Sequence, residues 1–277
     1  RSRFGDSAWG SAYALPARPC TVASARSVHV DRMTRDLEQH RKGHTVVIAR
    51  FEELDFQPTP MGDLMLRRRT DAQLGVDIFE VKLGEEFLMS SLFTVAEEEL
   101  ATLGLAATVG DDLAVLVGGL GLGYTAIAAL RDPRVSAMTV IDTMPAVIDW
   151  HRRGLLPVSD ALTSDPRTRL VLDDFFAVMR REPEGGTRYD AILLDVDHSP
   201  RHQLDASHAD LYTESGLRAL ARHLTDGGVF ALWSDDPPDD DFMATLSSVF
   251  SEAHAHVVDF ANPLTGGMSS NTVYVAR

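Results

Sequence analysis

Acidic residues follow three apolar segments of this chain, at positions where they could act together on one ligand. Asp142 follows the first of these segments, Asp173 and Asp174 the second, and Asp195 and Asp197 the third. If the segments are parallel strands of one sheet, their carboxyl ends meet at the edge where such sheets bind ligands. A single acid there often only caps the next helix. Acids after three strands therefore favour a joint functional role.

A glycine-rich turn precedes this set of acids. The apolar run 113–117 leads into four closely spaced glycines, a small-residue segment follows, and a further apolar run ends on Asp142. Strand, glycine turn, helix, strand and acid in this order are typical of a nucleoside site in a Rossmann-type sheet. The alternative is a tight turn that needs glycine for packing alone. The glycines that we expect to contact the ligand are Gly118, Gly119, Gly121 and Gly123.

The glycine spacing bears on the kind of nucleoside. A pyrophosphate-binding turn usually reads G-x-G-x-x-G, whereas this one reads G-G-x-G-x-G and has no glycine in the helix that follows. The spacing favours a ligand without phosphates, such as S-adenosylmethionine (AdoMet) or its decarboxylated form.

Each acid has an expected role. Asp142 would accept hydrogen bonds from ribose hydroxyls, and Asp173, with Asp174 beside it, would meet the adenine amino group. The alternative for Asp173 is to cap the following helix. A primary amine is protonated at pH 7, so Asp195 would bind and orient it and help to remove a proton. Asp197 would strengthen cation binding, unless it only begins a polar loop.

The elements that must position these residues predict an α/β fold. Strands and helices alternate from residue 111 onward, which predicts a methyltransferase-like Rossmann domain over 111–277: a seven-stranded, mostly parallel sheet with helices on both faces, ending in an antiparallel hairpin. Short strands with turn signals predict a small β domain with a linking helix over 45–110. Residues 1–44 read as a flexible tail. The run Glu97–Glu99 reads as an exposed first helical turn, with an acidic wall for an amine as the alternative.

Composition limits the function classes. The chain has 277 residues, 44% of them hydrophobic, and a net charge of −15. Such a charge repels nucleic acid and favours cationic small molecules, with solubility alone as the alternative. No apolar run approaches the ~20 residues of a membrane span. The single cysteine, Cys20, excludes an internal disulfide and a cysteine-based zinc site, and no metal-binding spacing occurs among the histidines. We therefore expect a cytoplasmic protein without a metal, a nucleic-acid partner or a membrane partner.

Over roughly residues 55–277 the chain resembles the spermidine synthase family, the polyamine aminopropyltransferases. VGGLGLG is similar to the family's glycine-rich GGGDGG segment, and VID, ending on Asp142, resembles its ribose-binding segment. LDDFF resembles the segment whose first acid meets adenine. YDAILLDVD resembles the segment whose leading acid is catalytic, which here is Asp195. The chain has Leu120 where the family's turn has an acid, and SSLFTVAEEEL where the family has a Tyr-His-Glu gate.

The resemblance implies a transferase, commonly a homodimer, that moves an aminopropyl group from decarboxylated AdoMet to a small amine. Two alternatives stay open. One is an AdoMet-dependent methyltransferase on the same scaffold. The other is a noncatalytic nucleoside-binding or scaffold protein that has lost the amine site.

Overall fold

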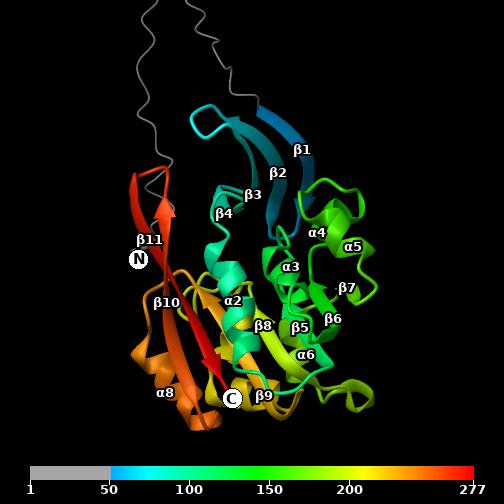
Figure 1. Cartoon of the computed structure of the whole chain (residues 1–277), viewed down its shortest axis with the longest axis vertical. Helices are drawn as coiled ribbons and strands as arrows, with labels where there is room; N and C mark the ends of the chain where they lie inside the picture. The colour runs from blue at the N-terminus through cyan, green and yellow to red at the C-terminus, as the bar shows by residue number, and fades with distance from the viewer. Residues whose placement is uncertain (1–50) are drawn as a thin grey trace, which may run out of the picture.

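The computed structural model describes residues 51–277, which form two β-sheets and their helices (Figure 1). The expected tail over 1–44 and the first residues of the β domain expected over 45–110 lie outside the described residues. The N-terminal sheet is antiparallel, with order β1-β2-β3-β4. Its strands are β1 (Phe51–Thr59), β2 (Gly62–Asp71), β3 (Val76–Leu83) and β4 (Glu86–Ser90).

The large sheet has seven strands in the order β10-β11-β9-β8-β5-β6-β7. Five neighbouring strands run parallel, and β11 pairs antiparallel with both β9 and β10. The structure thus confirms the predicted methyltransferase-like sheet, including its terminal hairpin. The strands are β5 (Leu113–Gly118), β6 (Val135–Asp142), β7 (Thr168–Leu172), β8 (Tyr189–Leu194), β9 (Leu224–Ser234), β10 (Ala253–Asn262) and β11 (Gly267–Ala276).

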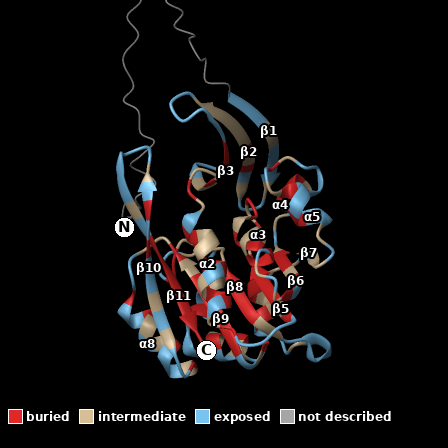
Figure 2. Ribbon diagram, viewed as in Figure 1, coloured by how far each residue is buried: buried red, intermediate tan, exposed pale blue. Residues whose placement is uncertain are grey.

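Helices cover both faces of this sheet because its central strands are apolar on both sides. In β5, Val115 and Val117 belong to one hydrophobic cluster and Leu116 to the other. The central strands are accordingly the most buried part of the molecule (Figure 2). The helices are α2 (Val95–Ala106), α3 (Tyr124–Leu130), α4 (Pro145–Arg152), α5 (Ser159–Ser164), α6 (Phe175–Arg180), α7 (Glu214–Ala221) and α8 (Asp240–Val249), with 3₁₀ turns η1 (Glu184–Gly186) and η2 (Ala206–Tyr212).

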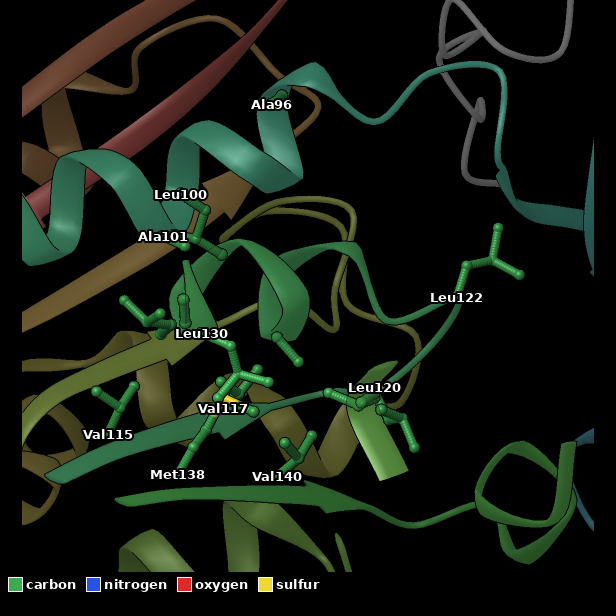
Figure 3. Packing of buried hydrophobic residues seen from close by; sticks show 14 of the residues in the cluster. Ala96, Leu100, Ala101, Val115, Val117, Leu120, Leu122, Leu130, Met138 and Val140 are labelled. Atoms are coloured by element: carbon green, nitrogen blue, oxygen red, sulfur yellow. The ribbon is translucent and has the colours of Figure 1, made fainter. Parts of the chain in front are cut away.

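Helix α2 links the two sheets and packs on the large one. Its buried residues Ala96, Leu100 and Ala101 belong to the same hydrophobic cluster as Val117 of β5 (Figure 3). Leu120 and Leu122 of the glycine turn are also buried in this cluster. The first turn of α2 is thereby held close to the glycine turn, and this contact places Glu97 in the site described below.

None of the helices within residues 51–277 is long and apolar enough to span a membrane.

Candidate active site

Two adjoining cavities lie between the N-terminal sheet and the carboxyl ends of β5, β6 and β8. The larger cavity has a volume of about 260 Å³ and the smaller about 70 Å³. Residues of β4, the glycine turn and the segment after β8 line both of them, and these shared residues are Leu88, Met89, Gly121, Asp195, Val196 and Leu204. The N-terminal sheet therefore closes the ligand-binding edge that the sequence predicts.

The glycine turn forms part of both walls. Gly119 has a φ of +92°, and a Cβ there would lie 2.0 Å from the carbonyl oxygen of Asp195. Glycine is thus required for the close approach of the turn to the end of β8. Gly119 lines the larger cavity, Gly123 the smaller and Gly121 both, whereas Gly118 lines neither and packs against Phe175. Close packing thus explains glycine at position 118, and the other three glycines also form part of the cavity walls.

Asp142 lies at the end of β6 in the wall of the larger cavity. Its carboxylate accepts hydrogen bonds from the backbone N–H of Leu120 at 2.9 Å and of Met144 at 2.7 Å. Burial raises its pKa above the usual value, although these hydrogen bonds oppose the rise. The backbone N–H of Gly121 also acts on this carboxylate. Because an ionised carboxylate has about four acceptor sites, Asp142 can still accept a hydrogen bond from a ligand hydroxyl.

The two acids after β7 occupy different environments. Asp174 lines the larger cavity and also caps α6, because its side chain accepts the N–H of Ala177 at 3.0 Å. Asp173 lines neither cavity, and its carboxylate accepts the N–H of Asp174 at 2.8 Å. The structure therefore brings Asp174 to the cavity and does not bring Asp173 there. The helix cap considered for Asp173 is supplied by Asp174.

Asp195 lies in the wall that the two cavities share. Its Oδ2 accepts a hydrogen bond of 2.6 Å from the hydroxyl of Thr125, the second residue of α3. Burial raises the pKa of Asp195 to about 6. A carboxylate with such a pKa is a stronger base near neutral pH than an exposed one.

Asp197, the second acid expected in catalysis, lines neither cavity. It is buried, and it accepts hydrogen bonds from the N–H of Leu204, from His208 Nδ1 and from the Tyr212 hydroxyl, all at 2.7–2.8 Å. These contacts hold the segment from Leu204 to His208, part of which lines the larger cavity. The ring of His208 stacks on Phe176 with 3.7 Å between centroids. The structure therefore does not bring the carboxylate of Asp197 to the wall of either cavity.

Glu97 differs from its expected place on an exposed helical turn. It lines the smaller cavity together with Asp195. Burial, followed by the charge of nearby Asp195, raises the pKa of Glu97 well above the usual value. Thr125 links the two residues, since its hydroxyl also lies 3.2 Å from the carbonyl oxygen of Glu97. The sequence signal was the run of three acids, of which only the first lines the cavity. At the start of this helix the Thr94 hydroxyl donates a hydrogen bond to Glu98 at 3.0 Å and does not cap the helix.

The linings of both cavities are acidic. None of the described residues that line them is Lys or Arg, whereas five are Asp or Glu. His198 lines the smaller cavity, and its Nε2 lies at hydrogen-bond distance, 2.8 Å, from a carboxylate oxygen of Glu86 of β4. No group of three or more His, Cys, Asp or Glu side chains within residues 51–277 is arranged to hold a metal ion. The arrangement suits a ligand that carries positive charge. The five acids are Glu97, Asp142, Asp174, Asp195 and Asp205.

Several curated proteins are similar in sequence. The chain is 30% identical over 158 residues to a polyamine aminopropyltransferase of Corynebacterium efficiens, which covers 54% of this chain and 29% of that protein. It is 30% identical over 152 residues to polyamine aminopropyltransferase 2 of Pseudomonas aeruginosa, which covers 51% of this chain and 41% of the relative. Putrescine N-methyltransferase 3 of Nicotiana tabacum is 30% identical over 132 residues, which are 48% of this chain and 32% of that protein. The chain thus spans about a third of the length of these relatives.

Solved structures and a family model extend the comparison. A spermidine synthase in complex with the transition-state analogue AdoDATO is 20% identical, with a TM-score of 0.61 over 80% of this chain and 72% of that one. The spermidine synthase of Thermotoga maritima is 19% identical, with a TM-score of 0.60, 80% of this chain and 71% of that one covered. The likeness in structure shows the fold. Because the model of the spermine/spermidine synthase domain matches residues 94–259, more than half of the chain, the protein belongs to that family.

Proposed function

We propose that this protein transfers an aminopropyl group from decarboxylated AdoMet to an amine acceptor. The observation that carries the proposal is the acidic lining without Lys or Arg. AdoMet has a carboxylate that needs a cation or several donors, whereas its decarboxylated form carries only positive groups beside the nucleoside. Carboxylates at the cavity walls attract the second donor and repel the first. Membership of the family and the aminopropyltransferases among the relatives support the same reaction.

In this proposal the nucleoside lies in the larger cavity. Asp142 accepts hydrogen bonds from the ribose hydroxyls, Gly119 and Gly121 allow the close approach, and Asp174 replaces Asp173 as the acid nearest to the base. The stacked Phe176 and His208 form an aromatic wall beside it. Aromatic walls of this kind suit a planar base.

Asp195 lies where the acceptor must meet the donor. The amine nitrogen attacks the methylene carbon beside the sulfonium, and the carbon–sulfur bond breaks with its electron pair passing to sulfur. Neutral methylthioadenosine leaves, and the new ammonium gives up a proton. Asp195 orients the amine and accepts that proton, which its raised pKa favours. Thr125 holds the carboxylate in place.

Titration calorimetry with decarboxylated AdoMet, AdoMet and methylthioadenosine tests the donor. We expect decarboxylated AdoMet to bind at least tenfold more tightly than AdoMet, followed by aminopropylated product in a mass-spectrometric assay with an amine panel. If none of the nucleosides binds, the proposal fails. If decarboxylated AdoMet binds and no amine is modified, the noncatalytic alternative replaces it.

Methyl transfer is the second candidate, because putrescine N-methyltransferase 3 is as similar in identity as the aminopropyltransferases. Tighter binding of AdoMet with methylation of an amine would establish it. A homodimer and a cytoplasmic location also stay proposals, which sedimentation and cell fractionation test.

A further inference from the structure

The acid that the resemblance assigns to adenine does not reach either cavity. Asp173 lines neither of them, and Asp174, which lines the larger one, already accepts the N–H of Ala177 as the cap of α6. The other carboxylate oxygen of Asp174 lies 4.0 Å from Arg180. A base in the larger cavity therefore needs a further polar group if the protein is to distinguish adenine from other purines.

His208, in the 3₁₀ turn η2, lines the larger cavity and has one ring nitrogen to offer a ligand. Its Nδ1 lies 2.7 Å from a carboxylate oxygen of Asp197, and within residues 51–277 its Nε2 makes no hydrogen bond. The two nitrogens of an imidazole ring point away from each other. Because Asp197 lies outside both cavity walls, the ring edge that carries Nε2 is the one available to a ligand in the cavity.

Asp197 determines which of the two ring nitrogens carries the proton. Its buried carboxylate also accepts the N–H of Leu204 at 2.8 Å and the hydroxyl of Tyr212 at 2.7 Å. Burial, followed by the charge of Asp197, raises the pKa of Tyr212 well above its usual value, so this hydroxyl stays a donor. An ionised carboxylate only accepts hydrogen bonds, so Nδ1 of His208 must carry a proton. In the neutral ring Nε2 is then an acceptor.

Phe176 fixes the plane of the His208 ring. The two rings stack with 3.7 Å between their centroids and 8° between their planes, and Phe176 is buried and lines the same cavity. The stack covers one face of His208 and leaves polar contact to the ring edge. The tautomer and the plane of the acceptor are therefore set by the protein before a ligand binds.

We propose that Nε2 of His208 accepts a hydrogen bond from the exocyclic amino group of adenine, and so selects an adenine nucleoside over one whose purine carries a carbonyl oxygen at that position. Asp197 acts through His208, as a positioning residue that holds the tautomer. The inference rests on the proposed function, since it takes the larger cavity as the nucleoside site. It differs from the contact expected from the sequence, in which Asp173 meets the amino group.

The test compares, by calorimetry, the affinities for methylthioadenosine and for methylthioinosine, in which a carbonyl oxygen replaces the amino group. Wild type should bind methylthioadenosine about 10- to 100-fold more tightly, because Nε2 faces a second acceptor in the inosine compound. His208→Asn keeps an N–H donor for Asp197 and has no acceptor at the position of Nε2, so its preference should be at least about fivefold smaller. Asp197→Asn should also lower the preference, because an amide does not require the proton on Nδ1.

His202→Asn is the matched control. His202 also contacts an acid through Nδ1, since Asp236 lies 3.0 Å away, but it lines neither cavity, so this variant should keep the wild-type preference. Asp174→Ser removes the competing carboxylate while keeping a residue that can cap the helix, and it should keep the preference as well. A variant that only loosens the fold weakens the binding of both nucleosides and leaves their ratio unchanged.

The outcomes separate this inference from the proposed function. An unchanged preference in His208→Asn would overturn the inference, and so would loss of the preference in Asp174→Ser alone. Tighter binding of methylthioinosine to wild type would show that Nε2 donates, which also overturns it. If neither nucleoside binds to wild type, the proposed function falls together with the inference. If both bind equally and aminopropyl transfer is detected, the reaction stands and only the role of His208 falls.

Discussion

Carboxylates are removed from water in two regions of the molecule, and the two regions differ in whether basic side chains pair with them. In the N-terminal sheet, Glu80 of β3 is fully buried, and its two oxygens accept hydrogen bonds from Arg67 Nε at 2.7 Å and Arg69 Nε at 2.9 Å. At the end of β8, Asp195 receives the Thr125 hydroxyl and has no basic partner in the described residues. Glu97 beside it also lacks one.

The difference separates an acid that serves the fold from acids that await a ligand. A buried charge is retained at low cost when it is paired and fully hydrogen-bonded, as Glu80 is. An unpaired carboxyl in a cavity instead has a raised pKa, and such groups are concentrated at functional sites. Arg67 and Arg69 belong to the first kind of region, whereas Arg68 between them pairs with Glu52 at the surface.

The largest expected effect concerns Asp195. Asp195→Asn should lower kcat by about 10³-fold, or about 4 kcal/mol of transition-state stabilisation, because the base that accepts the amine proton is lost. Affinity for methylthioadenosine should stay within about threefold, since the nucleoside depends on other groups. Single-turnover kinetics and calorimetry measure the two effects. Unchanged turnover would remove Asp195 from the proposed mechanism.

The next effect concerns Glu80, the buried acid that is paired with two arginines. Glu80→Gln should destabilise the protein by about 3 kcal/mol, because two arginines lose a charged partner in a buried site. Glu52→Gln is the control: Glu52 pairs with Arg68 at the surface, with 46% and 37% of the side chains exposed, and should cost less than 1 kcal/mol. Urea unfolding measures both. Equal free energies of unfolding for the two variants would contradict the distinction drawn between the regions.

The third effect is a pH dependence of stability. Burial raises the pKa of Asp195 from 3.8 to about 6, so the folded state binds this proton more tightly than the unfolded state. Its contribution to stability is therefore complete below pH 3.8 and is lost as the pH rises through about 6. Asp195→Asn and wild type should be similarly stable near pH 4. At pH 7.5 the variant should be more stable by about 2 kcal/mol, a value reduced for the partial exposure of the carboxyl.

Urea unfolding of both proteins between pH 4 and 7.5 measures this difference. A difference that does not change with pH would show that Asp195 has the same pKa in the folded and unfolded states. Such a result would contradict burial as the cause of a raised pKa at Asp195.

The sequence predicted the large sheet well because its strands are apolar runs bounded by glycine or acid. The sequence predicts strands over 168–172 and 189–194, which are the observed bounds of β7 and β8. It also predicts a strand over 137–141, whereas β6 begins two residues earlier and ends one residue later. Strand β1 was missed because Phe51–Thr59 contains three acids and Pro58, residues that an edge strand tolerates. Helix α5 was missed because its six residues, SDALTS, carry no apolar periodicity.

The site was predictable only where the backbone of the sheet decides the position. Asp142 is the last residue of β6 and Asp195 directly follows β8, and both line the cavities. The place of Asp197 depends on the path of the loop after β8, and that of Glu97 depends on how α2 packs against the large sheet. Both are tertiary effects, and neither has a periodic signal in the sequence.

The smallest effect distinguishes the acids that follow neighbouring strands β6 and β7. Asp142→Asn should weaken methylthioadenosine binding by about 1.5 kcal/mol, because an amide oxygen replaces only one of the two acceptors at the wall of the larger cavity. Asp173→Asn should change it by less than 0.5 kcal/mol, since Asp173 accepts the N–H of Asp174 outside that wall. Calorimetric titration of both variants with methylthioadenosine measures the two changes in binding free energy. An equal loss in both variants would mean that nucleoside binding draws Asp173 into the site, and the adenine role expected from the sequence would return to it.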